Sequence, residues 1–373
     1  MGLTLEKVDK IVGQEVYLKD IDLHFEPGSR NVLLGRTLAG KTSLLRILAG
    51  LDRPTRGRLL LKGKDYTGVS VRKRSVAMVY QQFINYPSMT VYDNIASPLK
   101  LAKLDRAEID RKVRQAAEML HIENFFDRLP AELSGGQQQR TAIARALVKD
   151  AELLLLDEPL VNLDYKLREE LRLELQAIFE RRESIVVYTT TEPAEALMMG
   201  GNIVVMDEGR VLQTGATPEV YHHPATLKVA EVFSDPPINY MQGRVAGKQA
   251  EMGEGIRFPL QGHLAELSSA ASGKASGKAS GKAYMFGIRC NHLSLERQHP
   301  EDIELAAKVV LSEINGSETF IHVAHGDVNL VVQDEGIRPV KIGSSLSVFI
   351  HPGRLFVYDD GGHLVASPDQ AAQ

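Results

Sequence analysis

Eight residues near the N-terminus, from Gly35 to Thr42, have the types and the spacing that hold a phosphate chain. Their sequence, GRTLAGKT, fits the pattern G-x-x-x-x-G-K-[ST]. In such a loop, backbone N–H groups surround the phosphates, the lysine ammonium reaches the terminal phosphates, and the last hydroxyl binds Mg²⁺. An apolar run over Val32–Leu34 precedes the loop, and a helical pattern over Ser43–Ala49 follows it. This order of strand, loop and helix predicts a nucleotide site.

An acidic pair, Asp157 and Glu158, follows four consecutive leucines. An apolar run of this kind predicts a buried strand, so the two carboxylates lie at its carboxyl end, where open α/β sheets bind ligands. An acidic pair that stands alone is more typical of a solvated turn. With a phosphate loop upstream, phosphoryl transfer is the favoured interpretation, because that chemistry needs metal, lysine and carboxylate more than a covalent intermediate.

Composition excludes several other classes of protein. The 373 residues exceed one average domain, so two or three domains are expected. A net charge of −4, with charged residues interspersed, argues against a nucleic-acid-binding surface. The single cysteine, Cys290, cannot form an intrachain disulfide and is interpreted as a small buried hydrophobe. No spanning helix or secretory signal is present, so membrane association is expected to come through a partner.

The elements expected around these residues change character along the chain. Residues 1–235 alternate short apolar runs with helical patterns, which is an α/β signature. Buried strands are predicted at 75–79, 153–156, 185–188 and 203–206, and amphipathic helices over 109–120 and 167–178. The stretch from about 87 to 140 is helical without strands. Residues 236–373 consist of short β-rich runs separated by Gly, Pro and Asp, for which small β-barrels are the expected solution. Within them, Ser-Gly-Lys-Ala occurs three times between 272 and 283, and a flexible loop is predicted over 268–283.

The sequence Leu133-Ser134-Gly135-Gly136-Gln137, with the order of motifs around it, resembles the ATPase subunits of ABC importers. The resemblance implies a RecA-like P-loop ATPase core with a helical insert, followed by OB-like barrels of the TOBE/MOP type that act in regulation. The segments 233–239 and 287–293 resemble landmarks of those barrels in sugar and polyol importers. The resemblance to ABC importer ATPases also implies that ATP and Mg²⁺ are bound.

Particular roles follow from the same resemblance. Asp157 is expected to hold Mg²⁺, and Glu158 to orient and deprotonate the water that attacks the γ-phosphorus. Gln81 aligns with a glutamine that contacts Mg²⁺ and that water, and Asp164 with the loop that crosses between two nucleotide sites. The signature residues are expected to cap the ATP of a partner subunit, so that neither subunit alone makes a complete site.

Among the departures from the family pattern, which include Val161 for a serine and Cys290 for a proline, two matter more for the nucleotide site. Thr191 stands where a histidine normally contacts the γ-phosphate; its hydroxyl can donate one hydrogen bond but carries no charge. We expect an altered but working site, because Glu158 is present. The aromatic residue that usually stacks on adenine aligns near Val12, with Tyr17 as a candidate shifted in register.

The candidate site residues form four groups. The catalytic group is Glu158, Gln81, Lys41 and Thr191. The nucleotide-binding group is Gly35, Arg36, Thr37, Leu38, Ala39, Gly40, Lys41, Thr42, Ser43 and Tyr17. The signature group is Leu133, Ser134, Gly135, Gly136 and Gln137, with Asp164 in the crossing loop, and the Mg²⁺ ligands are Thr42, Gln81 and Asp157.

The resemblance further implies a bacterial protein on the cytoplasmic face of the inner membrane. Its expected partners are a second ATPase subunit, identical or a paralogue, two membrane permease subunits and, through the complex, an extracytoplasmic solute-binding protein. Segments 37–43, 80–86 and 189–193 resemble the subunits of glycerol importers, which favours glycerol or another polyol or sugar. The alternative is a regulatory ATPase that signals through its C-terminal barrels without transport.

Overall fold

The computed structural model describes residues 2–161, 163–253, 255–270 and 282–368, which form two compact units, Met1–Thr217 and Pro218–Gln373. The triple Ser-Gly-Lys-Ala repeat lies almost wholly outside the described residues, so the loop predicted there stays a prediction. The boundary predicted after residue 235 also stays a prediction, although contacts divide the chain earlier, at Thr217.

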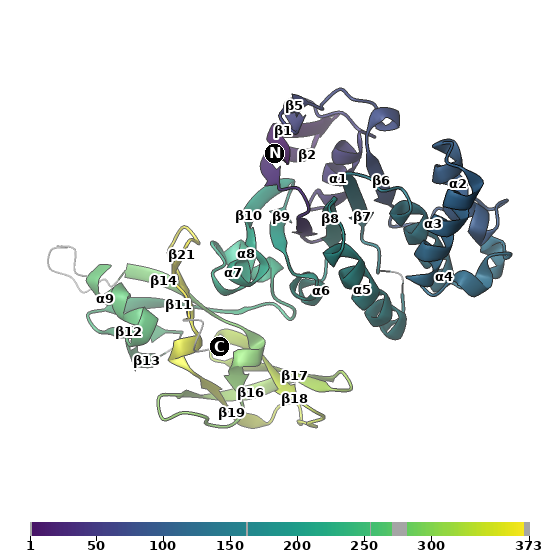
Figure 1. The fold of residues 1–373 in the computed structure, drawn as a ribbon. Helices are drawn as coiled ribbons and strands as arrows, with labels where there is room; N and C mark the ends of the chain where they lie inside the picture. Colours follow the sequence, from purple (N-terminus) through teal and green to yellow (C-terminus); the bar gives the residue numbers. More distant parts are fainter. Residues whose placement is uncertain (1, 162, 254, 271–281, 369–373) are drawn as a thin grey trace. The chain divides into compact units, whose positions relative to one another are not determined.

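The N-terminal unit contains two sheets (Figure 1). The larger has the order β10-β9-β3-β8-β7-β6, in which β10 alone runs antiparallel to its neighbour. Its strands are β3 (Arg30–Leu34), β6 (Val76–Val79), β7 (Leu153–Asp157), β8 (Ile185–Thr190), β9 (Asn202–Asp207) and β10 (Arg210–Ala216). The smaller, antiparallel sheet consists of β1 (Leu3–Val12), β2 (Glu15–Phe25), β4 (Arg56–Leu61) and β5 (Lys64–Asp65).

Helix α1 (Lys41–Ala49) shares one apolar core with both sheets, because its buried leucines, including Leu44 and Leu48, pack with Leu5 of β1 and Leu155 of β7. Further helices of this unit lie in and after the helical insert. They are α2 (Val91–Leu101), α3 (Arg106–Glu118), α4 (Gly135–Leu147), α5 (Tyr165–Glu180) and the shorter α6 (Pro193–Met199). The four strands predicted from apolar runs and the helices predicted over 109–120 and 167–178 are confirmed.

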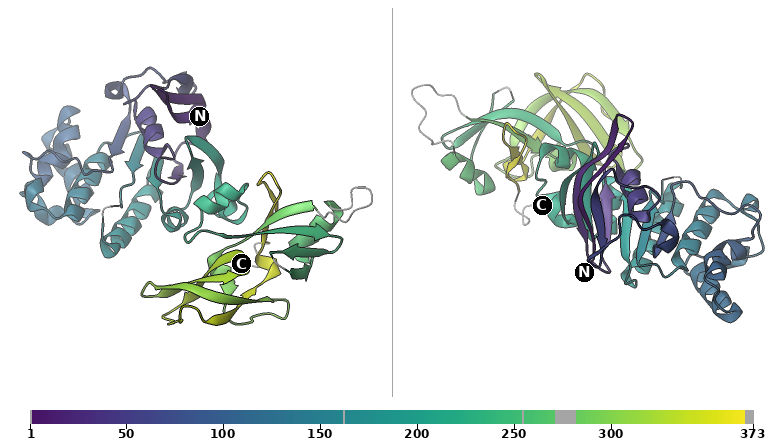
Figure 2. Two further views of the ribbon diagram at one scale, coloured as in Figure 1. Left: turned by 180° about the vertical axis from the view of Figure 1, so that it is seen from behind. Right: turned by 90° about the horizontal axis from the view of Figure 1, so that it is seen from above.

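The helical insert is a separate cluster within this unit. Helices α2, α3 and α4 group together next to β6, the edge strand of the larger sheet, and are the blue helices in Figures 1 and 2. Thr90 and Asp105 cap α2 and α3 by accepting backbone N–H groups of Asp93 and Glu108. The prediction of a helical segment between the phosphate loop and the acidic strand is confirmed.

The C-terminal unit is largely β-structure. One sheet has the order β13-β12-β11-β14-β20-β21, and the other β15-β19-β16-β17-β18. The strands are β11 (Asn239–Ala246), β12 (Gln249–Met252), β13 (Ile256–Pro259), β14 (Lys282–Ile288), β15 (Leu293–Ser294), β16 (Ile303–Ile314), β17 (Glu318–His325), β18 (Val328–Glu335), β19 (Ser345–Ile350), β20 (Phe356–Tyr358) and β21 (Leu364–Ala366). Both sheets bury side chains in one core, with Phe286 from the first and Val323 from the second. The predicted all-β region is confirmed.

Three short helices complete this unit: α7 (Thr217–His222), α8 (Leu227–Val232) and α9 (Leu267–Ala270). Ala230 of α8 packs with Phe356 and Tyr358 of β20, which explains why the contact boundary precedes residue 235. Within the described ranges, no helix is both long enough and apolar enough to cross a membrane.

Candidate nucleotide site

The phosphate loop joins the carboxyl end of β3 to the first turn of α1. Leu38 and Gly40 have positive φ angles of 71° and 97°. A Cβ on Gly40 would lie 2.8 Å from the carbonyl oxygen of Tyr17, so only glycine fits there. The loop leads through this left-handed glycine into the N-terminus of α1, an end of a helix that suits an anion.

Lys41 is the buried cation of this loop. Its side chain is 4% exposed, and Nζ donates hydrogen bonds to the carbonyl oxygens of Gly35 at 2.8 Å and Arg36 at 3.2 Å. The same Nζ lies 3.1 Å from Oε1 of Glu158. A buried ammonium needs such partners, and these hold it at the mouth of the loop, where a phosphate oxygen can replace the carboxylate.

Asp157 ends β7 beside this lysine, and its Oδ1 accepts two hydroxyl groups. Thr42 Oγ1 donates at 3.1 Å, and Thr189 Oγ1 donates at 3.0 Å. Burial raises the pKa of Asp157, while these two hydrogen bonds lower it. The paired oxygens of Thr42 and Asp157 are hard donors of the kind that Mg²⁺ prefers, so these two side chains fit a divalent cation.

Glu158 follows in a left-handed conformation, with φ at 44°. Its backbone N–H donates to Thr189 Oγ1 at 2.9 Å, and its Oε2 accepts from Nε2 of Gln81 at 3.3 Å. Gln81 comes two residues after β6, so the ends of adjacent strands bring the two side chains together. The structure thus connects Lys41, Thr42, Asp157, Glu158 and Gln81 in one network, although their sequence positions span more than a hundred residues.

Thr191 lies just beyond the end of β8 and lines a small hollow together with Glu158, Val161 and Arg168. Arg168 of α5 pairs with Glu192 at 2.6 Å, which fixes the next residue of the turn. The structure therefore places Thr191 near Glu158, the candidate catalytic carboxylate, as the sequence alignment predicts. The side chain of Thr191 is short.

Tyr17 approaches the loop mainly through its backbone. Its side chain is 40% exposed, and its hydroxyl donates to Oε2 of Glu15 at 2.8 Å, which raises the pKa of Tyr17. Its carbonyl oxygen faces Gly40. Val12, at the end of β1, is 54% exposed. Stacking of Tyr17 on adenine stays a prediction.

The signature residues lie at the start of α4, on a different hollow. Ser134 Oγ accepts the N–H of Gln137 at 3.3 Å, while Gln137 Oε1 accepts the N–H of Ser134 at 3.0 Å, a reciprocal capping box. The place of a Cβ on Gly135 is open space. The hollow, about 510 Å³, is also lined by Phe125 and by Leu167 of α5. Asp164 caps α5 by accepting the N–H of Leu167 at 3.0 Å.

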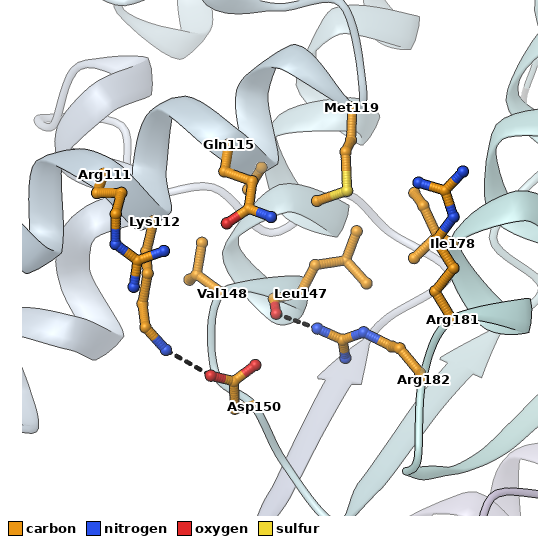
Figure 3. A pocket seen from close by; sticks show the side chains of 11 residues that line it. Arg111, Lys112, Gln115, Met119, Leu147, Val148, Asp150, Ile178, Arg181 and Arg182 are labelled. Atoms are coloured by element: carbon orange, nitrogen blue, oxygen red, sulfur yellow. Dashed lines mark hydrogen bonds and ion pairs between the residues drawn. The ribbon is translucent and has the colours of Figure 1, made fainter.

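The opposite end of α4 borders a second cleft, of about 360 Å³ (Figure 3). An ion pair joins Lys112 of α3 to Asp150, and Arg182 donates to the carbonyl oxygen of Leu147, while Met119 supplies apolar lining. These contacts connect the helical insert to the end of α5. None of the site residues predicted from the sequence lines this cleft.

One residue of the central network was absent from the sequence predictions. Thr189 is fully buried and contacts both members of the acidic pair. Its signal was the alternation of side chains along β8, which places Thr189 and Thr190 on opposite faces of the sheet.

A phosphate loop, an acidic pair at a strand end and a helical insert define a P-loop nucleotide hydrolase. The family described as ABC transporter matches residues 18–161. An uncharacterised ABC transporter ATP-binding protein of Bacillus subtilis, YurJ, is 35% identical over 96% of this chain and 97% of its own. The maltose/maltodextrin import ATP-binding protein MalK of Yersinia pestis is 33% identical over 97% of this chain and 96% of its own.

Solved structures agree. The dimeric ABC transporter cassette MJ0796 matches 58% of this chain and 98% of its own, at 27% identity and a TM-score of 0.53. Its post-hydrolysis state, bound to ADP and Pi, matches with the same coverage, at 28% identity and a TM-score of 0.53. The chain belongs to the ABC transporter ATP-binding proteins and is an ABC-type ATPase.

Proposed function

We propose that this chain is the ATP-hydrolysing subunit of an importer for a sugar or a polyol. The observation that carries the proposal is the network of Lys41, Asp157, Glu158 and Gln81 at one edge of the parallel sheet. The full-length similarity to a maltose/maltodextrin import protein supports the importer class, because it extends over the C-terminal unit as well.

In this proposal each side chain has one task toward ATP and water. Lys41 binds the terminal phosphates, after its ammonium exchanges the Glu158 carboxylate for a phosphate oxygen. Glu158, once released, accepts a proton from the attacking water, which Gln81 helps to orient. Thr42 and Asp157, with Gln81, would hold Mg²⁺, which when bound supplies positive charge against the charge developing on the phosphates.

The second half of each site comes from another subunit. Ser134, Gly135 and Gly136 begin a helix of thirteen residues whose N-terminus faces an open hollow, a suitable surface for the γ-phosphate of a partner's ATP. The dimeric arrangement of MJ0796 supports this placement. We propose that the partner is a paralogous ATPase. Two permease subunits would couple the dimer to the inner membrane, so that this chain lies on the cytoplasmic face of that membrane.

Glycerol is the solute that we propose to test first, on the resemblance of segments 37–43, 80–86 and 189–193 to glycerol importers. The complex of this chain with its proposed permease subunits would be reconstituted in vesicles that enclose ATP and Mg²⁺. Uptake of labelled glycerol, maltose and other polyols is then measured in the presence of the binding protein.

ATP-dependent uptake of glycerol supports the whole proposal, and uptake of another polyol or sugar replaces only the solute. ATP hydrolysis without uptake of any solute, stimulated instead by a partner outside the membrane, would contradict the importer and favour the regulatory ATPase.

A further inference from the structure

Strand β8 ends with two threonines, Thr189 and Thr190, whose side chains have different surroundings. Thr190 Oγ1 lies on one side, where it donates to the buried carboxylate of Glu195 and accepts the N–H of Glu192 at 3.0 Å. Thr189 lies on the other side, because side chains alternate along a strand. The hydroxyl of Thr189 contacts the acidic pair directly.

Thr189 uses its hydroxyl fully on that pair. It donates to Asp157 Oδ1 at 3.0 Å and accepts the backbone N–H of Glu158 at 2.9 Å, and its side chain is 0% exposed. A hydroxyl supplies one donor and can accept as well, so a single oxygen atom fixes both consecutive residues. A methyl group in its place would leave a buried N–H without this acceptor.

The two contacts act on different features of the acidic pair. The bond to Oδ1 fixes the rotation of the Asp157 carboxylate. Thr42 Oγ1 contacts the same Oδ1 atom at 3.1 Å. The bond to the N–H holds Glu158 in its left-handed backbone conformation, with φ at 44°, which is uncommon for a residue other than glycine. The direction in which the Glu158 side chain leaves the strand depends on that conformation.

We propose that Thr189 is a positioning residue for hydrolysis, which orients the Asp157 carboxylate toward the metal position and the Glu158 carboxylate toward the attacking water. The inference rests on the roles proposed above for Asp157 and Glu158. Thr189 itself touches neither ATP nor water in this scheme. Residues of this kind, one contact removed from a metal ligand, typically change metal affinity and activity when their hydrogen bonds are lost.

The test compares Thr189→Val, which has nearly the same shape without the hydroxyl, with Thr189→Ser, which keeps it. The matched control is Thr319→Val. Thr319 is also 0% exposed, and its hydroxyl also donates once, to Gly336 O at 2.7 Å, and accepts once, from Arg338 N at 2.9 Å, but it lies in the C-terminal unit. Both valine variants therefore lose the same number of buried hydrogen bonds.

Four quantities are measured on the full chain: kcat for ATP, KM for ATP, the Mg²⁺ concentration that half-saturates activity, and the Mg²⁺ dependence of ADP binding by calorimetry. Thr189→Val should lower kcat about tenfold to a hundredfold, with KM changed less than about threefold, and should raise the Mg²⁺ requirement in both the activity and the binding assays. Thr189→Ser should recover most of both losses. Thr319→Val should lower only the melting temperature.

The inference is overturned if Thr189→Val keeps the wild-type kcat and Mg²⁺ dependence, or if Thr189→Ser fails to restore them while folded. An equal loss in Thr319→Val would show a general effect of lost stability, and would also overturn it. If the wild-type chain itself releases no phosphate, the proposed function fails, and the calorimetric comparison of Thr189→Val with Thr189→Ser still decides the positioning role.

Discussion

Buried polar side chains at the sheet edge of the N-terminal unit differ in their partners from three in the C-terminal unit, Asn239, Arg289 and Thr319. At the sheet edge, Lys41 pairs with the Glu158 carboxylate in addition to two backbone carbonyls, and Thr189 contacts the Asp157 carboxylate and the backbone N–H of Glu158. In the C-terminal unit, Thr319 binds two backbone groups of the 336–338 turn. Asn239 likewise binds both the N–H and the carbonyl of Val331.

The buried Arg289 of the C-terminal unit follows the same rule, since it donates to the carbonyl oxygen of Tyr221 while its guanidinium lies 3.5 Å from the centre of the Tyr221 ring. Side chains that bind backbone groups fix loops and remain occupied in the folded protein. Side chains that bind one another can exchange a partner for a ligand. The comparison therefore assigns chemistry to the first unit and structural roles to these residues of the second.

The largest effect is expected from Lys41→Ala. Removing the ammonium takes away the main cationic partner of the terminal phosphates, so ATP affinity should fall more than about a hundredfold. Equilibrium binding of labelled ATP measures it. The control is Lys149→Ala, because the Lys149 ammonium donates to a backbone carbonyl, that of Val76, at 2.6 Å. Equal affinities in the two variants would contradict the role of Lys41 in binding ATP.

Thr191→His sharpens the comparison within the site. The longer imidazole should restore a donor to the transferring phosphate, and a charge-assisted hydrogen bond felt fully in the transition state raises the rate about tenfold to a hundredfold. Steady-state ATPase assays on the assembled transporter measure the change. No change, or a loss with ATP affinity intact, would mean that the turn has adapted to threonine through the Arg168–Glu192 pair.

A smaller effect, on stability alone, is expected from protonation of His292 in the C-terminal unit. Burial, with Arg354 and Arg289 adding repulsion, lowers the pKa of His292 to about 4. The unfolded chain takes up this proton below about pH 6.5, so the unit should lose up to about 3 kcal/mol as pH falls from 6.5 to 4.

Hydrogen exchange followed by mass spectrometry separates the two units and measures this loss. His292→Gln should remove most of the pH dependence of protection in the C-terminal unit. A pH dependence that persists in His292→Gln would assign the effect to another group.

The smallest change in ATP binding is expected on removal of the C-terminal unit. A chain ending at Thr217 should bind ATP within about threefold of the full-length protein, because every residue of the network precedes this point. A chain ending at Asp235 should bind equally but be less soluble, since α8 loses its packing on Phe356 and Tyr358. A soluble, folded chain of 217 residues that does not bind ATP would refute the division of roles.

Much of the N-terminal unit was predictable because its signals are local. Four apolar runs predicted strands β6 to β9, and the loop pattern fixed the position of Lys41. The closeness of the Gln81 and Glu158 side chains was predictable from the resemblance, since the ends of parallel strands meet at one edge of the sheet.

Two features could not be predicted from the sequence in the same way. The role of Thr189 depends on which residue of β8 lies beside Asp157 of β7, a property of sheet order and register, in which Asp157 pairs with Thr189. The short helix α8 follows the α/β pattern in sequence, yet it packs with a strand more than a hundred residues later. Long-range packing of this kind leaves no periodic signal.

The central claim is that the side-chain network at the sheet edge hydrolyses ATP, and Glu158→Gln tests it most directly. The amide keeps the shape of the carboxylate but cannot accept the proton of the attacking water. Phosphate release and size-exclusion chromatography with ATP and Mg²⁺ are measured together. We predict ATP affinity within about threefold of wild type, turnover reduced at least about a hundredfold, and accumulation of an ATP-bound dimer. Full turnover by Glu158→Gln would contradict the account.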